Sequence, residues 1–173
     1  MSHPEMLFEG KRFRVVRLRQ LMPDGTEHFR EVVRHPGAVV ILPLLDDGRI
    51  YFVQNYRVAV DETLVELPAG TLEPGEDPAE TARRELAEET GCGAGRLEHL
   101  ISFYTSPGIL DEQMHFYLAT ALQQGAAAPE AGEDLQPLIT TWEEALDMVR
   151  HGGIKDAKTI AALLYYAEFV RGS

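Results

Sequence analysis

The sequence predicts an α+β protein in which β-strands dominate the first half of the chain and most helices follow them. Apolar runs of strand length, separated by turn residues and without helical periodicity, indicate the strands. Helix caps, with apolar residues three and four positions apart, appear only from Asp77 onward. The length of 173 residues and the 45% hydrophobic composition suit a single full core.

The strands are expected to begin with two hairpins. Residues 13–21 and 27–34 flank a Pro-Asp-Gly-Thr turn sequence, which predicts an N-terminal hairpin. Residues 38–45 are apolar throughout, as expected of a strand covered on both faces. An Asp-Gly turn follows them and leads into residues 49–54, which predicts a second hairpin. Further strands are expected at residues 64–67, 97–104 and 113–122.

The clearest helix signal begins at Asp77, a good N-cap residue. Pro78 fits the first helical position, and Glu80 stands where a capping box has its acid. The helix should end at Gly91, in the left-handed conformation of a C-cap. Two more helices are expected at residues 142–150 and 158–171, the latter with an apolar stripe of Ile160, Leu163, Leu164 and Ala167. The stretch 125–137 has no periodicity and is interpreted as an exposed loop.

Charge and composition exclude several classes of protein. With 16 Lys and Arg against 28 Asp and Glu, the formal charge is −12, which argues against a nucleic-acid binder. The longest apolar stretch, residues 38–45, is far short of the roughly 20 residues that a membrane helix needs. The N-terminus lacks an apolar signal core, and the single Cys92 cannot form an intrachain disulfide. A cytoplasmic location is therefore expected.

The candidate chemistry lies on the helix that Asp77 begins. Glu85, Glu88 and Glu89 are three and four residues apart, so their carboxylates share one face and repel one another. A hard divalent cation would reverse this repulsion, because Mg²⁺ binds carboxylate oxygens together with waters and substrate phosphates. Arg84, four residues before Glu88, can hold that carboxylate in position. The alternative is a solvated acidic helix face without a ligand.

The wider sequence around this helix resembles the Nudix box at every defining position. The matching residues are Gly70, Glu76, Arg84, Glu85, Leu86, Glu88, Glu89, Gly91 and Cys92, the last in a slot that is usually aliphatic. The resemblance implies the Nudix fold, a mixed β-sheet sandwiched between helices, here with an N-terminal β-hairpin extension. It also implies hydrolysis of a nucleoside diphosphate linked to another moiety, with Mg²⁺ or Mn²⁺ as cofactor. The metal ligands that it implies are Glu85, Glu88, Glu89 and the carbonyl of Ala69, with Arg84 and Glu88 as catalytic residues.

The family commonly uses a base outside the box, and the acidic loop 129–134 is where we expect it. By resemblance to ADP-ribose hydrolases of the family, Glu133 falls on the loop glutamate near the metals and is assigned as base and metal ligand. Two residues earlier, where relatives often have a second glutamate, this sequence has Ala131. Glu130 is the reserve candidate. The alternative is that these loop acids only solvate the chain.

A second set of residues resembles the ADP-ribose pyrophosphatase subgroup. Pro107 lies sixteen residues after Gly91, at about the distance that marks this subgroup. The segments around Arg57, Glu66 and Glu112 also match it. The resemblance implies substrate-binding roles for Arg57, Glu66, Ser106, Pro107, Gly108 and Glu112.

Two of these residues could instead have a purely structural role. Arg57 could form a surface ion pair with Asp61 or Glu62, and pairs of that kind are common and contribute little. Glu66 is a lone acid among apolar strand residues, so it requires either a partner or a ligand.

The resemblance also implies an assembly. Residues 1–36 are expected to be a dimer-forming β segment, and residues 37–173 the Nudix hydrolase domain. Arg30 and Glu31 match substrate-binding positions that reach a neighbouring active site in the subgroup; the alternative is polar positions on an exposed strand. Together these features predict a homodimer that hydrolyses ADP-ribose to AMP and ribose 5-phosphate. The alternatives are a pyrophosphatase for another nucleotide sugar, such as GDP-mannose, and a Nudix-like regulator that binds ADP-ribose without turnover.

Overall fold

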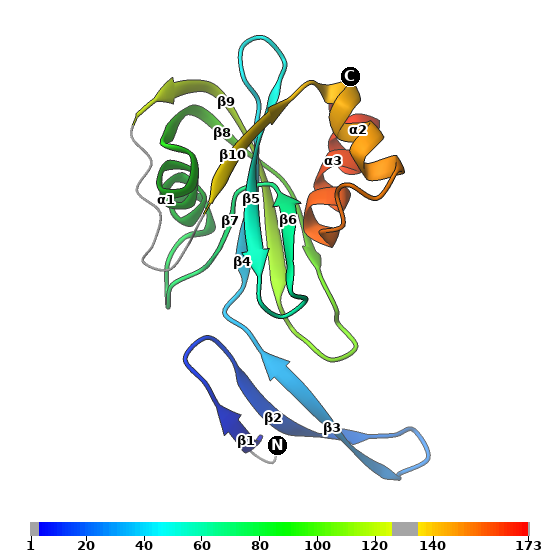
Figure 1. The fold of residues 1–173 in the computed structure, drawn as a ribbon. Helices are drawn as coiled ribbons and strands as arrows, with labels where there is room; N and C mark the ends of the chain where they lie inside the picture. Colours follow the sequence, from blue (N-terminus) through cyan, green and yellow to red (C-terminus); the bar gives the residue numbers. More distant parts are fainter. Residues whose placement is uncertain (1–3, 126–134, 173) are drawn as a thin grey trace.

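A computed structural model of the chain describes residues 4–125 and 135–172. The main body of the protein has β-sheets in the middle, with helix α1 (Pro78–Thr90) on one side and helices α2 (Trp142–Arg150) and α3 (Ala157–Phe169) on the other (Figure 1). The strands are β1 (Glu5–Glu9), β2 (Arg14–Leu21), β3 (Glu27–Arg34), β4 (Ala38–Pro43), β5 (Ile50–Arg57), β6 (Glu62–Glu66), β7 (Ala69–Thr71), β8 (Cys92–Tyr104), β9 (Gln113–Gln124) and β10 (Gln136–Thr140). The predicted α+β class is confirmed.

Strand β4 is the centre of the main sheet, whose strand order is β7-β4-β9-β8. It runs parallel to β9, with Ala38 opposite Met114, and antiparallel to β7. Its side chains are buried on both faces: Val40 and Leu42 pack toward α2 and α3, whereas Val39 and Ile41 pack toward α1. The prediction of a strand covered on both faces is confirmed.

The expected hairpin of residues 38–45 and 49–54 is wrong. Strand β5 belongs to a different sheet, of order β10-β5-β6, and the bridge between Leu44 and Ile50 is what remains of the expected pairing. Both strands are apolar and are joined by a tight turn, so local sequence fits a hairpin as well as it fits two diverging strands. The pairing is instead decided by partners that lie far away in the sequence, such as β9 for β4.

Helix α1 begins and ends where predicted, but Glu80 does not complete the capping box expected of it. The Asp77 side chain accepts a hydrogen bond from the amide of Ala79, and Gly91 has φ 72°, the left-handed conformation that glycine adopts without a Cβ clash. Ala82 and Leu86 are fully buried against Val39 and Ile41. The same face that docks on the sheet therefore fixes how the neighbouring acidic residues are directed.

The C-terminal helices also lie close to where they are expected. A capping box of Thr141 and Glu144 begins α2, and Asp156 caps α3. The predicted stripe of α3 is partly wrong, because Leu164 is 49% exposed whereas Leu163 is fully buried. None of the helices in the described part of the chain is long and apolar enough to span a membrane.

The N-terminal hairpin is confirmed and is extended by β1 into a sheet of order β1-β2-β3. This sheet lies apart from the main body (Figure 1). It is joined to the body by hydrogen bonds between Val33 and the loop at residues 109–111 and by an ion pair of Arg34 with Asp111. Large apolar side chains remain exposed on it, namely Met6, Leu7, Phe8, Phe13, Leu21 and Phe29.

The loop predicted at residues 125–137 extends too far at its C-terminal end. Residues 136 and 137 open β10, with Pro137 opposite Val53, and residues 126–134 lie outside the described part of the chain. A proline fits there because β10 is an edge strand, bonded within its sheet only to β5 among the described residues.

Candidate active site

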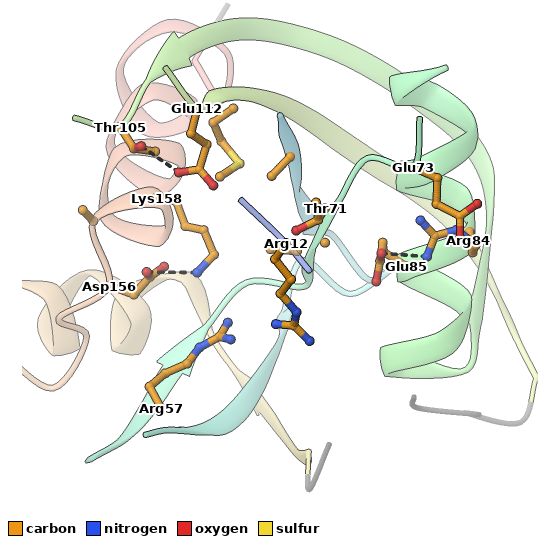
Figure 2. A pocket seen from close by; sticks show the side chains of 15 residues that line it. Arg12, Arg57, Thr71, Glu73, Arg84, Glu85, Thr105, Glu112, Asp156 and Lys158 are labelled. Atoms are coloured by element: carbon orange, nitrogen blue, oxygen red, sulfur yellow. Dashed lines mark hydrogen bonds and ion pairs between the residues drawn. The ribbon is translucent and has the colours of Figure 1, made fainter. Parts of the chain in front are cut away.

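A cavity of 440 Å³ opens between helix α1 and the start of helix α3, over the ends of strands β4, β5 and β7 (Figure 2). Its volume is within the range of small-molecule sites. The side chains that line it are largely charged. Arg84, Glu85 and Glu73 lie on the α1 side, and Arg12 lies between the two sides. The opposite side carries both signs of charge, from Arg57, Lys158, Asp156 and Glu112. The cavity can therefore receive a ligand that carries both negative charge and bound cations.

Arg84 organises the acidic side of the cavity. Its Nη1 donates to Glu85 at 2.7 Å and to Glu88 at 3.1 Å, and its Nε and Nη2 donate to the two oxygens of Glu76. The contact with Glu88 is the one expected from the i,i+4 spacing. Because the guanidinium lies among these carboxylates, it offsets the repulsion that their spacing creates.

The pKa of Glu76 reflects this arrangement. The hydrogen bonds from Arg84 lower the pKa of Glu76 from 4.5 to about 2. The same interactions, with Glu76 first, raise the pKa of Arg84 above its usual value. Arg84 is therefore always charged in this site, and Glu76 is ionised at neutral pH.

Strand β7 meets helix α1 at very short range. The amide of Ala69 donates to Glu89 Oε2 at 3.2 Å, and the Glu89 residue is 8% exposed. A Cβ added at Gly70 would overlap the carboxyl group of Glu85, so this position requires glycine. The Nudix-box glycine thus lets the backbone of β7 approach the carboxylates of α1.

The oxygen donors here suit a hard cation. Glu85 and Ala69 line the same cavity, and carboxylate and carbonyl oxygens are the ligands that Mg²⁺ accepts together with waters and phosphates. Within residues 4–125 and 135–172, no group of three or more His, Cys, Asp or Glu side chains converges on one metal position. The reason is geometric, because Glu85 and Glu88 turn toward Arg84 whereas Glu89 turns toward β7.

The opposite side of the cavity is built around Glu66. Arg57 donates to Glu66 through Nε at 2.7 Å and Nη2 at 2.6 Å, and Lys158 donates to Glu66 Oε2. Burial alone would raise the pKa of Glu66, but the hydrogen bonds from Arg57 and the charge of Lys158 outweigh burial and lower it. The alternative pairing of Arg57 with Asp61 or Glu62 is not what the structure has: Tyr56 donates to Asp61, and Lys155 donates to Glu62.

The remaining wall comes from the loop between β8 and β9. Glu112 lines the cavity, accepts a hydrogen bond from Thr105 at 2.7 Å and lies 3.5 Å from His35 Nδ1. Its neighbour Asp111 instead holds Arg34 and the amide of His35 at the junction with the N-terminal sheet. Asp111 therefore serves the junction, whereas Glu112 lines the cavity and also contacts His35 at the junction.

The structure brings some of the sequence-predicted residues together and leaves others apart. Five of them line the cavity, namely Arg57, Ala69, Arg84, Glu85 and Glu112, and Glu66 lies directly behind Arg57. Ser106, Pro107 and Gly108 are exposed in the loop after Thr105, and Arg30 and Glu31 are exposed on β3, where Glu31 pairs with Arg17. Glu130 and Glu133 lie outside the described residues.

Sequence reasoning missed the contribution of helix α3. Asp156, Ala157 and Lys158 line the cavity, although the sequence indicated only the start of a helix at this point. The one available signal was the lone acid Glu66, which required a partner without indicating where that partner lies. The partner is 92 residues away in sequence.

Residues 33–163 match the NUDIX domain. The chain belongs to the Nudix family. It is 42% identical over 163 residues to an ADP-ribose pyrophosphatase of Bacillus subtilis, covering 93% of this chain and 88% of the relative. It is also 42% identical over 166 residues to a methanol dehydrogenase activator of Bacillus methanolicus, with the same coverage.

A solved structure of an ADP compounds hydrolase has the same fold. Its TM-score against this Nudix chain is 0.83 at 23% identity, with 99% of this chain and 96% of the other covered. The match confirms the Nudix fold predicted from the box.

The Arg84–Glu76 contact leads to a prediction about stability and pH. The lowered pKa of Glu76 stabilises the folded state fully above the unfolded value of 4.5, and this contribution is lost as the pH falls toward about 2. Glu76→Gln should therefore lower the free energy of unfolding at neutral pH by about 1 to 2 kcal/mol. The difference from the unmodified protein should shrink as the pH falls.

Urea unfolding of the metal-free protein between about pH 7 and about pH 3 measures this difference. Glu80→Gln, an exposed position in the first turn of α1, is the matched control. A gap between Glu76→Gln and the unmodified protein that stays constant with pH would contradict the assignment.

Proposed function

We propose that this Nudix hydrolase cleaves the pyrophosphate of ADP-ribose to give AMP and ribose 5-phosphate, with Mg²⁺ or Mn²⁺ as cofactor. The observation that carries the proposal is that Glu85 on α1 lies across the cavity from Arg57, with Arg12 between them. A diphosphate fits between these sides, because cations bound to the carboxylates and the Arg57 guanidinium both attract its oxygens. The substrate named by the Bacillus subtilis relative supports the choice of ADP-ribose.

The roles of the acidic residues follow from the chemistry of the bond. Glu85, Glu88, Glu89 and the carbonyl of Ala69 would hold the divalent metal, which neutralises phosphate charge and lowers the pKa of the attacking water. Arg84 holds the carboxylates of Glu85 and Glu88, and of these two Glu85 lines the cavity. In the reaction, water oxygen bonds to one phosphorus, the bridging P–O bond breaks, and the bridging oxygen leaves with the other phosphate.

The substrate-binding side is proposed from the remaining residues. The Arg57 guanidinium uses Nε and Nη2 for Glu66, which leaves Nη1 to donate to a phosphate oxygen. Glu112 is placed to accept hydrogen bonds from a ribose hydroxyl, and the exposed turn at residues 106–108 would close over the same part of the substrate. Among residues 4–125 and 135–172, Arg12 makes no hydrogen bond or ion pair, and its side chain extends between the two sides of the cavity, where it can meet phosphate or adenine.

Two alternatives share this site. A pyrophosphatase for another nucleotide sugar, such as GDP-mannose, would use the same diphosphate chemistry with a different base and sugar. A regulator that binds ADP-ribose without turnover would have no use for Glu85, Glu88 and Glu89. The name of the Bacillus methanolicus relative raises the second alternative, because an activator acts on another enzyme.

The test is product identification with a panel of ADP-ribose, GDP-mannose, NADH and diadenosine polyphosphates in Mg²⁺. We expect AMP and ribose 5-phosphate from ADP-ribose at the highest kcat/KM. Glu85→Gln should lower kcat by about 100-fold or more, because it removes a metal-binding charge and keeps the shape. Glu80→Gln, on the same helix but exposed, is the control. Preferred cleavage of another substrate, or binding of ADP-ribose without products, would overturn the proposal.

We further propose that Glu133 is the general base and a metal ligand, with Glu130 as reserve. A base must reach the attacking water, and an acidic loop can approach once cations neutralise the site. Glu133→Gln should lower kcat strongly with little change in KM, whereas Glu130→Gln should do little. Steady-state kinetics of the two variants test this. The reverse pattern transfers the role to Glu130, and small effects from both remove the loop from the mechanism.

The assembly proposed for the chain is a homodimer built by residues 1–36, with residues 37–173 as the hydrolase domain. Exposed apolar side chains on the N-terminal sheet, such as Phe8 at 53% and Phe29 at 55%, support an interface there. Arg30 and Glu31 do not line the cavity of their own subunit, which supports the proposal that they reach the cavity of the other subunit. The buried, unpaired Cys92 suits a reducing, cytoplasmic location.

Complementation tests this assembly. Arg30→Ala and Glu85→Gln should each be inactive or nearly so, but a refolded equal mixture should recover up to about one quarter of the activity, because half of the dimers then carry one intact site. Light scattering should give the mass of a dimer. An active monomer, or no recovery on mixing, would contradict the proposal.

A further inference from the structure

The first turn of helix α3 is bonded to the chain directly before β7. Lys158 donates to the carboxylate of Glu66 at 2.5 Å, and the hydroxyl of Thr159 accepts from the amide of Leu67 at 2.9 Å. Asp156 holds both of these side chains, because it accepts from Lys158 at 3.0 Å and from the Thr159 hydroxyl at 2.6 Å. The helix is therefore fixed to the last residue of β6 and to the residue after it, directly before the backbone that we propose binds the metal.

Glu66 connects this helix to Arg57. Its side chain is 2% exposed, and its two oxygens are shared between Arg57 and Lys158. The contact with Arg57 is not the one that strand pairing favours, because Arg57 lies opposite Glu62 and Glu66 lies opposite Val53. The Arg57 side chain must therefore run back along its strand to reach Glu66.

The direction of the Arg57 side chain depends on this contact. Arg57 is 41% exposed and lies at the end of β5, so without Glu66 its long side chain would sample many rotamers. Glu66 can direct the Arg57 side chain only while the Glu66 carboxylate is itself fixed. A buried carboxylate stays ionised and in place only when its partners hold it. Lys158, at 14% exposure, is the buried member of the pair of cations that hold Glu66.

We propose that Lys158 is a positioning residue, which holds Glu66 in the orientation that aims the Arg57 guanidinium into the cavity. The inference rests on the role proposed above for Arg57 in binding the substrate diphosphate. Lys158 acts through Glu66 and Arg57, so its contribution disappears when Arg57 is absent. The start of α3 thereby becomes part of the substrate site although it belongs to the helical layer of the fold.

The test is a double-mutant cycle on the full-length protein, with Lys158→Met, Arg57→Ala and the double variant. Lys158→Met should raise KM for ADP-ribose about tenfold while kcat changes by less than about threefold, since the binding of the diphosphate is weakened. In the Arg57→Ala background, Lys158→Met should raise KM for ADP-ribose less than about twofold. Glu66→Gln, which keeps the shape, should raise KM like Lys158→Met and should also be silent without Arg57; it serves as the second variant should Lys158→Met fold poorly.

Lys155→Met is the matched control. Lys155 pairs at 2.5 Å with Glu62, which lies on the same strand as Glu66. Both side chains of this pair are exposed, at 55% and 44%, and neither residue lines the cavity. This variant should leave KM and kcat within about twofold of the unmodified protein, because exposed pairs contribute little.

The outcomes separate the roles that Lys158 could have. Full additivity of Lys158→Met and Arg57→Ala would mean that Lys158 acts on the substrate independently, and would overturn the inference. A lower melting temperature with unchanged KM would also overturn it, because the lysine would then be purely structural. A normal KM in Arg57→Ala would remove the substrate role of Arg57 itself, whereas a raised KM there with a silent Lys158→Met would overturn only the positioning.

Discussion

The active site depends on the close approach between helix α1 and the backbone of strand β7. Gly70 has no Cβ, so the carboxyl group of Glu85 can lie against it, and Glu89 accepts a hydrogen bond from the amide of Ala69. The helix is held at this distance by the adjacent arc, where Ala82 and Leu86 are fully buried on β4. Glu85 and Ala69 thus line one cavity, because the missing Cβ of Gly70 and the small apolar stripe of α1 allow helix and strand to touch. Gly70, Glu85 and Glu89, which make this contact, are all residues of the Nudix box.

Charge compensation is the second constraint on the site. Carboxylates at spacings of three and four would repel one another in the absence of metal, and Arg84 relieves this repulsion by donating to Glu76, Glu85 and Glu88. On the other side of the cavity the cations Arg57 and Lys158 are held by Glu66, and Asp156 also accepts from Lys158. The α1 side therefore keeps an excess of negative charge, since one arginine meets three carboxylates, whereas the charges on the other side balance. This arrangement supports the proposed binding of a diphosphate, with its divalent cations toward α1 and its oxygens toward Arg57.

The sequence predicts those parts of this arrangement that are local. The caps of α1 at Asp77 and Gly91, the acidic face and the doubly covered β4 follow from short-range patterns, and the structure confirms them. The partners of β4 and β5 do not, because each strand pairs with segments remote in sequence while the turn between them resembles that of a hairpin. Strand β7 has only three residues and gives no periodic signal. The contact between Glu66 and Lys158 spans 92 positions, and nothing in the neighbourhood of either residue indicates the other.

The segment from Glu66 to Gly70 connects these constraints into one structure. At its first residue it is held by Lys158 and Arg57, at Leu67 by the hydroxyl of Thr159, and at Ala69 and Gly70 by the carboxylates of α1. Helices from the two opposite faces of the main body therefore meet on one short stretch of chain, which carries Glu66 at one end and Ala69, the proposed metal-binding carbonyl, near the other. A displacement of either helix would move both ends, since five successive residues leave little backbone to absorb it. The distance across the cavity, from Glu85 on α1 to Arg57 on β5, therefore depends on how the helices pack on the two faces of the main body.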